Sequence, residues 1–189
     1  LMVIFQAIKY ADLRASNPVT DIILSNTRAY DVDIFFVFGA MFMVFIISLL
    51  ILSRPKYIPF AAQNIALFYF IRSVFISLTH VGPFPTQLSI DYDFLANSRF
   101  LGSFFTSDDL FFSGHVGLPF LIALIFWEYK HVRYFFLGLS VFFGLVVLLG
   151  HIHYSIDVFA APFMAYGIFK IANYLFPRDY ALITAARGS

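Results

Sequence analysis

Long apolar stretches separated by short polar segments run along most of the chain. The longest uncharged stretch, IFFVFGAMFMVFIISLLIL at residues 34–52, is about as long as a helix must be to cross a hydrocarbon core of roughly 30 Å. Residues 1–8 are typical of the end of a further span, and because the chain starts at Leu1 we expect that helix to be cut short. The pattern predicts an all-α integral membrane protein with about six transmembrane helices in one bundle. The remaining spans are expected at 57–79, 111–127, 134–150 and 156–176.

The composition agrees with a membrane protein and excludes other classes. Hydrophobic residues make up 61% of the 189 positions and charged residues only 12%, whereas an average soluble domain is about 25% charged. The absence of Cys excludes disulfide bonds and thiolate metal sites, and the net charge of +1 argues against nucleic acid as a partner. We expect one domain over residues 1–189, and the terminal RGS at 187–189 resembles a remnant of cloning.

The distribution of basic residues predicts which end of the bundle faces the cytoplasm. Threading the spans alternately places the loops at 9–33, 81–112 and 150–155 on one face and those at 53–57, 128–133 and 177–189 on the other. The first face carries four basic residues, Lys9, Arg14, Arg28 and Arg99, and the second carries six, Arg54, Lys56, Lys130, Arg133, Arg178 and Arg187. Cytoplasmic loops are enriched in Lys and Arg. We therefore expect the first face to be periplasmic, extracellular or lumenal.

Three titratable residues converge at that non-cytoplasmic face. His115 lies in FFSGHVGLPF at the start of one predicted span, and His153 and Asp157 lie in HIHYSIDVFAA at the start of another. The i, i+4 spacing of His153 and Asp157 places both on one side of a helix. The carboxylate can then hold one imidazole nitrogen and leave the other free to attack. Two imidazoles and a carboxylate suffice for a two-step displacement at phosphorus.

The two histidine motifs resemble a known family. FSGH at 112–115 and HIHYSID at 151–157 resemble the type 2 phosphatidic acid phosphatase superfamily, and more narrowly its sphingomyelin synthase branch, in which Ser-Gly-His and His-Tyr-(Ser/Thr)-x-Asp carry the chemistry. NPVTDIILSNTRAYD at 17–31 is similar to the Pro-x-x-Asp loop of that branch, and FYFIRSVFISLTHVGPFP at 68–85 is similar to its arginine-bearing third helix. The resemblance covers roughly residues 15–176.

The resemblance and the chemistry together assign roles to the residues. We expect His153 to form a phosphohistidine that carries the headgroup, Asp157 to orient its ring, and His115 to protonate the departing diacylglycerol oxygen and then to deprotonate the acceptor. The acceptor is either a lipid alcohol such as ceramide or water. No metal or other cofactor is expected, since these residues already fill every role. The expected substrate-binding residues are Arg72, Arg99, Asp109, Ser113, Gly114 and Tyr154.

Departures from the wider superfamily favour a phosphodiester substrate. Phe112 stands where classical lipid phosphatases have Pro, and Val146 and Val147 stand where they have Ser-Arg. The Arg54-Pro55 pair lies on the opposite predicted face. The site therefore lacks cations that a phosphomonoester dianion needs more than a diester monoanion does.

Several residues also have a structural interpretation. Ser113 could serve as an ordinary helix N-cap, and His115 could be a satisfied polar group near the membrane interface. Arg72 could pair with Asp21 or Asp109 and not with phosphate, while Asp109 could be a solvated loop charge.

Two alternative functions remain open from the sequence. The first is a lipid phosphate phosphatase that acts on phosphatidic acid or a related phosphomonoester. The second is a transporter or lipid-binding protein in which His115, His153 and Asp157 form a proton relay, although a relay needs ionisable residues at several depths and these gather at one face. The bilayer and a phospholipid are the expected partners in the main hypothesis, and the oligomeric state is left open.

Overall fold

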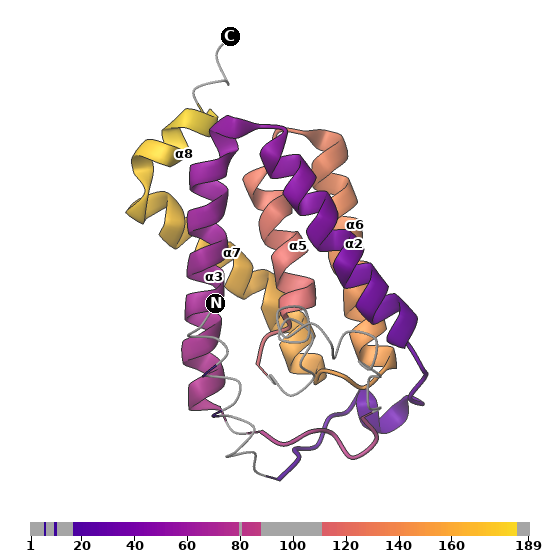
Figure 1. Cartoon of the computed structure of the whole chain (residues 1–189). Coiled ribbons are helices and arrows are strands. Elements are labelled where there is room, and N and C mark those ends of the chain that lie inside the picture. Colours follow the sequence, from indigo (N-terminus) through magenta and orange to yellow (C-terminus); the bar gives the residue numbers. More distant parts are fainter. Residues whose placement is uncertain (1–5, 7–9, 11–16, 80, 88–110, 185–189) are drawn as a thin grey trace.

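The computed structural model describes residues 6, 10, 17–79, 81–87 and 111–184, and within these it is all-α, as predicted. Two short 3-10 helices, η1 (Leu24–Asn26) and η2 (Pro55–Tyr57), accompany six α-helices (Figure 1). The α-helices are α2 (Asp33–Leu52), α3 (Ile58–Leu78), α5 (Gly114–Ile125), α6 (Lys130–Leu149), α7 (Ser155–Leu175) and α8 (Pro177–Thr184).

Four of these segments are long and apolar enough to cross a membrane. They are Asp33–Leu52, Pro55–Leu78, Lys130–Leu149 and Ser155–Leu175, which correspond to four of the predicted spans. The prediction of an integral membrane protein is thereby confirmed. Of the additional span expected at residues 1–8 only Gln6 is described, and the remnant expected at 187–189 falls outside the described part of the chain.

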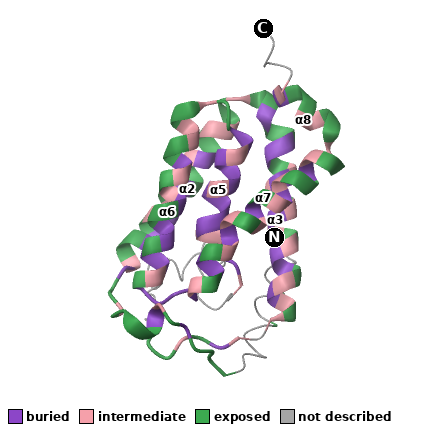
Figure 2. Cartoon of the chain, turned by 180° about the vertical axis from the view of Figure 1, so that it is seen from behind, coloured by how far each residue is buried: buried purple, intermediate pink, exposed green. Residues whose placement is uncertain are grey.

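Helix α5 is shorter than the span predicted at 111–127. It has 12 residues, so it is about 18 Å long, less than the hydrocarbon thickness. The helix begins only after Ser113 and ends at Ile125, and Pro119 lies inside it. Most of its residues are buried, and it packs against α6 and α7 (Figure 2). Because protein surrounds α5, its apolar sequence reflects burial in the bundle and does not require it to span the lipid.

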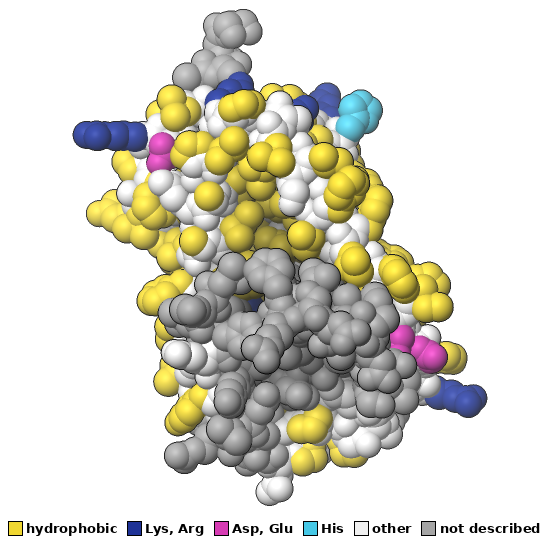
Figure 3. Space-filling view, in the orientation of Figure 1, with side chains coloured by type: hydrophobic (Ala, Val, Ile, Leu, Met, Phe, Trp, Pro, Cys, Tyr) yellow, Lys and Arg dark blue, Asp and Glu magenta, His cyan; other side chains and the backbone are white. Residues whose placement is uncertain are grey.

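The outer helices bury one side and expose apolar side chains on the other. In α2, Phe36 is 1% exposed and packs in the core, whereas its neighbour Phe35 is 58% exposed. Figure 3 shows hydrophobic side chains over much of the surface between the end that carries α8 and the residues drawn in grey. Such a surface is expected where lipid and not water is the solvent.

Helix α6 ends in a left-handed turn that directs the chain into α7. His151 has a φ of 52°, and its backbone N–H donates to the carbonyl of Leu148. Glycine usually takes the left-handed position after a helix, but here the glycine is one residue earlier. A Cβ on Gly150 would lie 2.5 Å from Cγ2 of Val32. Packing therefore requires glycine at 150, and His151 takes the strained conformation.

Candidate active site

His153 and Asp157 lie together at the start of α7. Nδ1 of His153 is 3.5 Å from Oδ2 of Asp157, and the two residues are 2% and 5% exposed. Neither atom has a hydrogen-bond partner among the described residues. The sequence placed both residues on one helix, but α7 begins at Ser155, so His153 precedes it. The pair forms nevertheless, because the chain enters the helix at Tyr154 in an extended conformation.

The start of α5 meets the start of α7 next to this pair. The backbone N–H of Ser113 donates to the carbonyl of Asp157 at 3.0 Å, which joins the two motifs. Ser113 is the N-cap of α5, but its side chain makes no cap hydrogen bond. Its Oγ is fully buried and has no partner in the described part of the chain. Ser113 therefore occupies the N-cap position, but its hydroxyl does not cap the helix. The hydroxyl can instead form a hydrogen bond with another group.

His115 is the second residue of α5 and is half-buried. Its ring contacts Phe36, with centroids 4.3 Å apart, and Phe143, with centroids 5.7 Å apart. These rings belong to α2 and α6. Aromatic packing from two helices thus restricts the orientation of the imidazole.

Arg72 extends from α3 to the first turn of α5. It is 3% exposed, and its Nε donates to the carbonyl of Phe112 at 3.2 Å. A Cβ built on Gly114 would lie 3.4 Å from Cζ of Arg72, so the guanidinium lies directly against this glycine. The first N–H groups of a helix have no partner within the helix and favour anions. The buried guanidinium of Arg72 thus lies beside the N-terminal turn of α5.

Asp21 holds the start of α7 from a loop far away in sequence. Its Oδ2 accepts a hydrogen bond from the backbone N–H of Ser155 at 2.7 Å. Its Oδ1 accepts from the N–H groups of Ile23 and Leu24. Burial acts to raise the pKa of Asp21, but these hydrogen bonds outweigh it and hold the pKa below its ordinary value. From the sequence, Asp21 was considered only as a partner for Arg72. The Pro-x-x-Asp motif was the signal that could have indicated its role in positioning the start of α7.

Tyr154 and His151 bind the loop before α2 and the loop after α3 to the segment between α6 and α7. The hydroxyl of Tyr154 donates to the carbonyl of Gly82 and accepts from the N–H of Val19. The ring nitrogens of His151 lie 2.6 Å and 3.3 Å from the hydroxyls of Thr86 and Thr27. Because Tyr154 uses its hydroxyl to tie the loops, a contact between that hydroxyl and substrate stays a prediction.

Burial also changes the pKa of these two residues. It raises the pKa of the Tyr154 phenol, which keeps the phenol protonated. It lowers the pKa of His151, and the carboxylate of Asp21 acts in the opposite direction. Both side chains are therefore held in their neutral forms near neutral pH.

Two predicted site residues, Arg99 and Asp109, lie outside the described residues, and Asp109 is also the second candidate partner of Arg72. The described residues contain no group of three or more His, Asp and Glu side chains arranged to hold an ion. The described site therefore consists of Arg72, Ser113, Gly114, His115, His153 and Asp157, with Asp21, His151 and Tyr154 around it.

Comparison with known proteins supports the resemblance for part of the chain. Residues 107–174 match the family model described as PAP2 superfamily C-terminal. This region contains both histidine motifs, so their similarity to the superfamily is confirmed, while the match does not distinguish one branch from another. No curated protein and no solved structure matches the chain.

Proposed function

We propose that the chain is a membrane lipid phosphotransferase or phosphodiesterase of the sphingomyelin synthase type, which cleaves a phospholipid headgroup through a phosphohistidine. The observation that carries the proposal is the buried pair of His153 and Asp157, 3.5 Å apart, joined by a backbone hydrogen bond to the Ser-Gly-His segment. A buried carboxylate beside an imidazole orients the ring and stabilises its charged form. The superfamily match over residues 107–174 supports a lipid phosphate as the substrate class.

In the first step, the lone pair of His153 Nε2 attacks phosphorus. Nδ1 faces Asp157, so Nε2 is the nitrogen left for this bond. The bond between phosphorus and the diacylglycerol oxygen breaks, and His115 donates a proton to that oxygen. The products are diacylglycerol and a phosphohistidine that carries the headgroup.

In the second step, His115 accepts the proton of an acceptor hydroxyl. The hydroxyl oxygen forms a bond to phosphorus, and the bond between phosphorus and Nε2 of His153 breaks. With a lipid alcohol such as ceramide the reaction is a transfer, and with water it is a hydrolysis. His115 and His153 return to their starting protonation states in both cases.

The phosphate oxygens would lie between Arg72 and the first turn of α5. The guanidinium against Gly114, the N–H groups at the start of α5 and the buried hydroxyl of Ser113 provide the donors. A Cβ at position 114 would be in van der Waals contact with the guanidinium, so Gly114 leaves the space of one methyl group beside it. Arg99 and Asp109 stay additional candidates for headgroup contacts.

The surroundings of the site favour a phosphodiester. Val147 is fully buried and Val146 is 5% exposed, so neither position supplies charge where the classical phosphatases have Ser-Arg. Phe112 packs edge-on against Phe68 with centroids 5.4 Å apart. Arg54 lies over the ring of Tyr129 at the opposite end of the bundle. Among the described residues of the site, Arg72 is then the one Lys or Arg.

A second candidate is a lipid phosphate phosphatase that acts on a phosphomonoester. The superfamily match favours it, because that match extends to phosphatase-type enzymes in general. It would use the same residues with water as the acceptor.

The proposed active site faces the non-cytoplasmic side of the membrane. The basic residues Arg54, Lys56, Lys130, Arg133 and Arg178 all lie at the end opposite to His115 and His153. Figure 3 shows most of the Lys and Arg side chains of this view gathered at the end that carries α8. The tendency of Lys and Arg to stay in the cytoplasm supports this orientation.

Mass spectrometry of lipid products tests the proposal. The purified chain is incubated with phosphatidylcholine, phosphatidylethanolamine or phosphatidic acid, with and without ceramide, beside His153→Ala. His131→Ala is the matched control, because His131 is exposed at the opposite end. We expect diacylglycerol from a diester in the wild type and in His131→Ala only, with a new phosphosphingolipid when ceramide is present.

Other outcomes separate the alternatives. If diacylglycerol is formed from phosphatidic acid alone, the phosphodiesterase proposal is wrong and the phosphatase is supported. Undiminished product formation by His153→Ala would contradict both enzymes and leave the transporter or lipid-binding hypothesis.

A further inference from the structure

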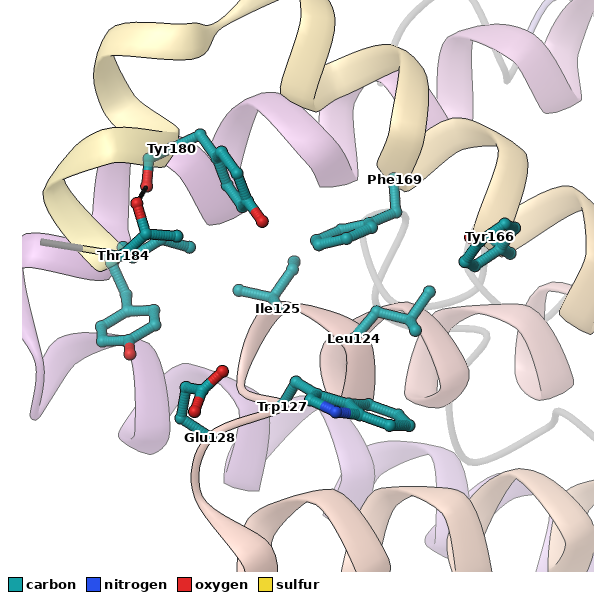
Figure 4. A pocket seen from close by; sticks show the side chains of 10 residues that line it. Leu124, Ile125, Trp127, Glu128, Tyr166, Phe169, Tyr180 and Thr184 are labelled. Carbon is teal, nitrogen blue, oxygen red and sulfur yellow. Dashed lines mark hydrogen bonds between the residues drawn. The ribbon is translucent and has the colours of Figure 1, made fainter. Parts of the chain in front are cut away.

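A pocket of about 230 Å³ lies at the end of the bundle opposite to His115 and His153. Its walls come from the C-terminal end of α5, the second half of α7 and α8. Figure 4 shows Phe169 and Tyr180 across the space from Trp127. Leu124 in the wall is nine positions after His115 on α5, about 14 Å further along the helix axis. The pocket is therefore separate from the candidate active site.

The pocket extends into the depth of the membrane and reaches the outer surface of the bundle. Tyr166 in its wall is nine positions before the end of α7, about 14 Å inside that apolar span. Tyr166 and Trp127 are 50% and 45% exposed, so the wall is continuous with the surface that faces lipid. A ligand can therefore enter the pocket from the bilayer.

Most of the lining is apolar. Eight of the ten lining residues are aromatic or aliphatic, and the other two are Thr184 and Glu128. An apolar cavity of about 150 Å³ already stays dry and binds benzene, and this pocket is larger. An acyl chain is the apolar group that the bilayer supplies, and its burial against these side chains is favourable by packing.

Basic side chains flank the pocket on the outer faces of its rings. Arg133 lies over the ring of Trp127 at 4.6 Å, and Lys56 lies over the ring of Tyr57 at 5.5 Å. Both rings belong to the lining. Glu128 is the one charged residue among the described lining residues, and it already interacts within the protein. Two cations beside one engaged carboxylate leave the surroundings of the pocket with a net positive charge.

The position of Arg133 suits a lipid phosphate. Its Nη1 donates to the carbonyl of Trp127 at 3.2 Å, and its Nη2 donates to the hydroxyl of Tyr134 at 3.1 Å. Exposed Trp and Tyr side chains are enriched at the level of the lipid headgroups. Because a guanidinium has five N–H donors, these two bonds fix Arg133 at that level and leave donors for an anion.

An amphiphile with an apolar chain and an anionic head matches both parts of this site. We propose that the pocket binds one acyl chain of an anionic phospholipid, whose phosphate lies beside Arg133 and Lys56. The proposal rests on the membrane location of the bundle and not on the catalytic chemistry proposed above.

Quenching of Trp127 by brominated acyl chains tests the proposal, because the chain has one Trp and that residue lines the pocket. The full chain is placed in phosphatidylcholine nanodiscs that contain a small fraction of either brominated phosphatidylglycerol or brominated phosphatidylcholine. Bromine quenches an indole on contact, and the brominated phosphatidylcholine measures the unselective contact of Trp127 with surrounding lipid. We expect phosphatidylglycerol to quench as a ligand that binds roughly three- to fivefold more tightly.

Two variants with the same change of charge separate this site from the general potential of the basic end. Lys56→Gln is expected to reduce the preference for phosphatidylglycerol about threefold. Arg178→Gln is the matched control, because Arg178 is an exposed cation at the same end that lies over none of the described lining rings. It should leave the preference unchanged.

A third variant fills the pocket without changing charge. The hydroxyl of Thr184 donates to the carbonyls of Tyr180 and Ala181 in its own helix, so Thr184→Phe breaks no contact between helices. We expect quenching by phosphatidylglycerol to fall to the level of phosphatidylcholine. Ala181→Phe, on the exposed side of the same helix, should retain the preference. Unchanged elution and thermal unfolding in detergent will show that the variants are folded.

Three results would overturn the proposal. They are equal quenching by the two brominated lipids, an effect of Arg178→Gln as large as that of Lys56→Gln, and a preference for phosphatidylglycerol that survives Thr184→Phe. The measurements are repeated in His153→Ala, in which the proposed cleavage of the lipid cannot occur. Loss of lipid binding at the pocket and failure of the proposed function are therefore observed separately.

Discussion

The carboxylate of Asp21 accepts a 2.7 Å hydrogen bond from the backbone N–H of Ser155, which is 134 positions further along the chain. This bond satisfies an N–H group in the first turn of α7, which has no partner inside the helix. His153 and Asp157 lie on either side of Ser155. A loop before the first described transmembrane helix thus sets where the proposed nucleophile and its carboxylate lie.

Replacing Asp21 by Asn is expected to reduce turnover by roughly 10- to 100-fold, because small displacements of catalytic groups are costly. The amide keeps the size of the carboxylate but loses one of the two acceptor oxygens. The Michaelis constant should change less, since both oxygens of Asp21 accept hydrogen bonds from backbone N–H groups. Initial rates are measured well below the unfolding temperature, with Asp31→Asn as the control. Equal turnover in the wild type and Asp21→Asn would remove Asp21 from a positioning role.

Asp21 also makes stability depend on acidity. The pKa of Asp21 in the folded state lies below its ordinary value. As the pH falls, the carboxylate of Asp21 is therefore protonated in the unfolded state before it is protonated in the folded state. The stabilisation is therefore present above the unfolded-state pKa and is lost as the pH falls below about 4. Thermal unfolding between pH 3 and 6 should show a smaller loss in Asp21→Asn than in the wild type.

The length and apolarity of the sequence were sufficient to predict α2, α3, α6 and α7, because a helix that crosses the membrane needs about 20 predominantly apolar residues. The same criterion overestimated the length of α5 and its ability to span the membrane. A helix buried among other helices is equally apolar, and no local signal separates the two environments. Only the packing of α5 against α6 and α7 shows the difference.

The candidate site was predictable where it depends on local spacing. The four-residue separation of His153 and Asp157 predicted their proximity, although His153 precedes the helix. The contacts of Asp21 with Ser155 and of His151 with Thr27 and Thr86 join segments distant in sequence. Such contacts depend on the tertiary arrangement, which a single sequence does not encode in any local pattern.

His151 predicts a second dependence on acidity, at higher pH. Burial lowers its pKa, so the unfolded state binds a proton first and the folded state loses stability as the pH falls below about 6.5. In His151→Asn this loss between pH 7.5 and 5 should be smaller, since Asn tolerates the left-handed backbone and does not titrate. Thermal unfolding midpoints at the two pH values test this, and the exposed His131→Asn should behave as the wild type does.

Ser113→Ala is expected to separate activity from stability. The Oγ of Ser113 is buried without a partner, so its removal breaks no hydrogen bond and should leave the unfolding midpoint unchanged or slightly raised. Turnover should fall roughly tenfold if this hydroxyl donates to phosphate. Ser140→Ala is the matched control, because the Oγ of Ser140 donates to the carbonyl of Val116 at 2.8 Å. It should lose about 1 kcal/mol of stability.

Two glycine substitutions test how tightly the helices pack behind the site. A Cβ on Gly117 would lie 2.9 Å from Cζ of the buried Phe68, so Gly117→Ala should cost about 1–3 kcal/mol of unfolding free energy. A Cβ on Gly138 has no atom within 4 Å, and Gly138→Ala should gain about 0.5–1 kcal/mol from helix propensity. Unfolding midpoints in one detergent compare them, and equal midpoints would mean that α5 and α3 can separate to admit the methyl group.

The roles of His115 and His153 can be distinguished with a substrate whose leaving group departs without being protonated. With a phosphodiester whose leaving group is p-nitrophenolate, departure requires no protonation, so His115→Ala should still complete the first step. Without His115 the acceptor hydroxyl is not deprotonated, and the phosphohistidine should accumulate. We expect a burst of about one p-nitrophenolate per chain and an adduct on His153 in the mass of the intact protein. His153→Ala should give neither the burst nor the adduct. An adduct on another residue, or a burst in His153→Ala, would contradict the assignment of His153 as the nucleophile. Asp157 would then orient an imidazole that does not attack phosphorus.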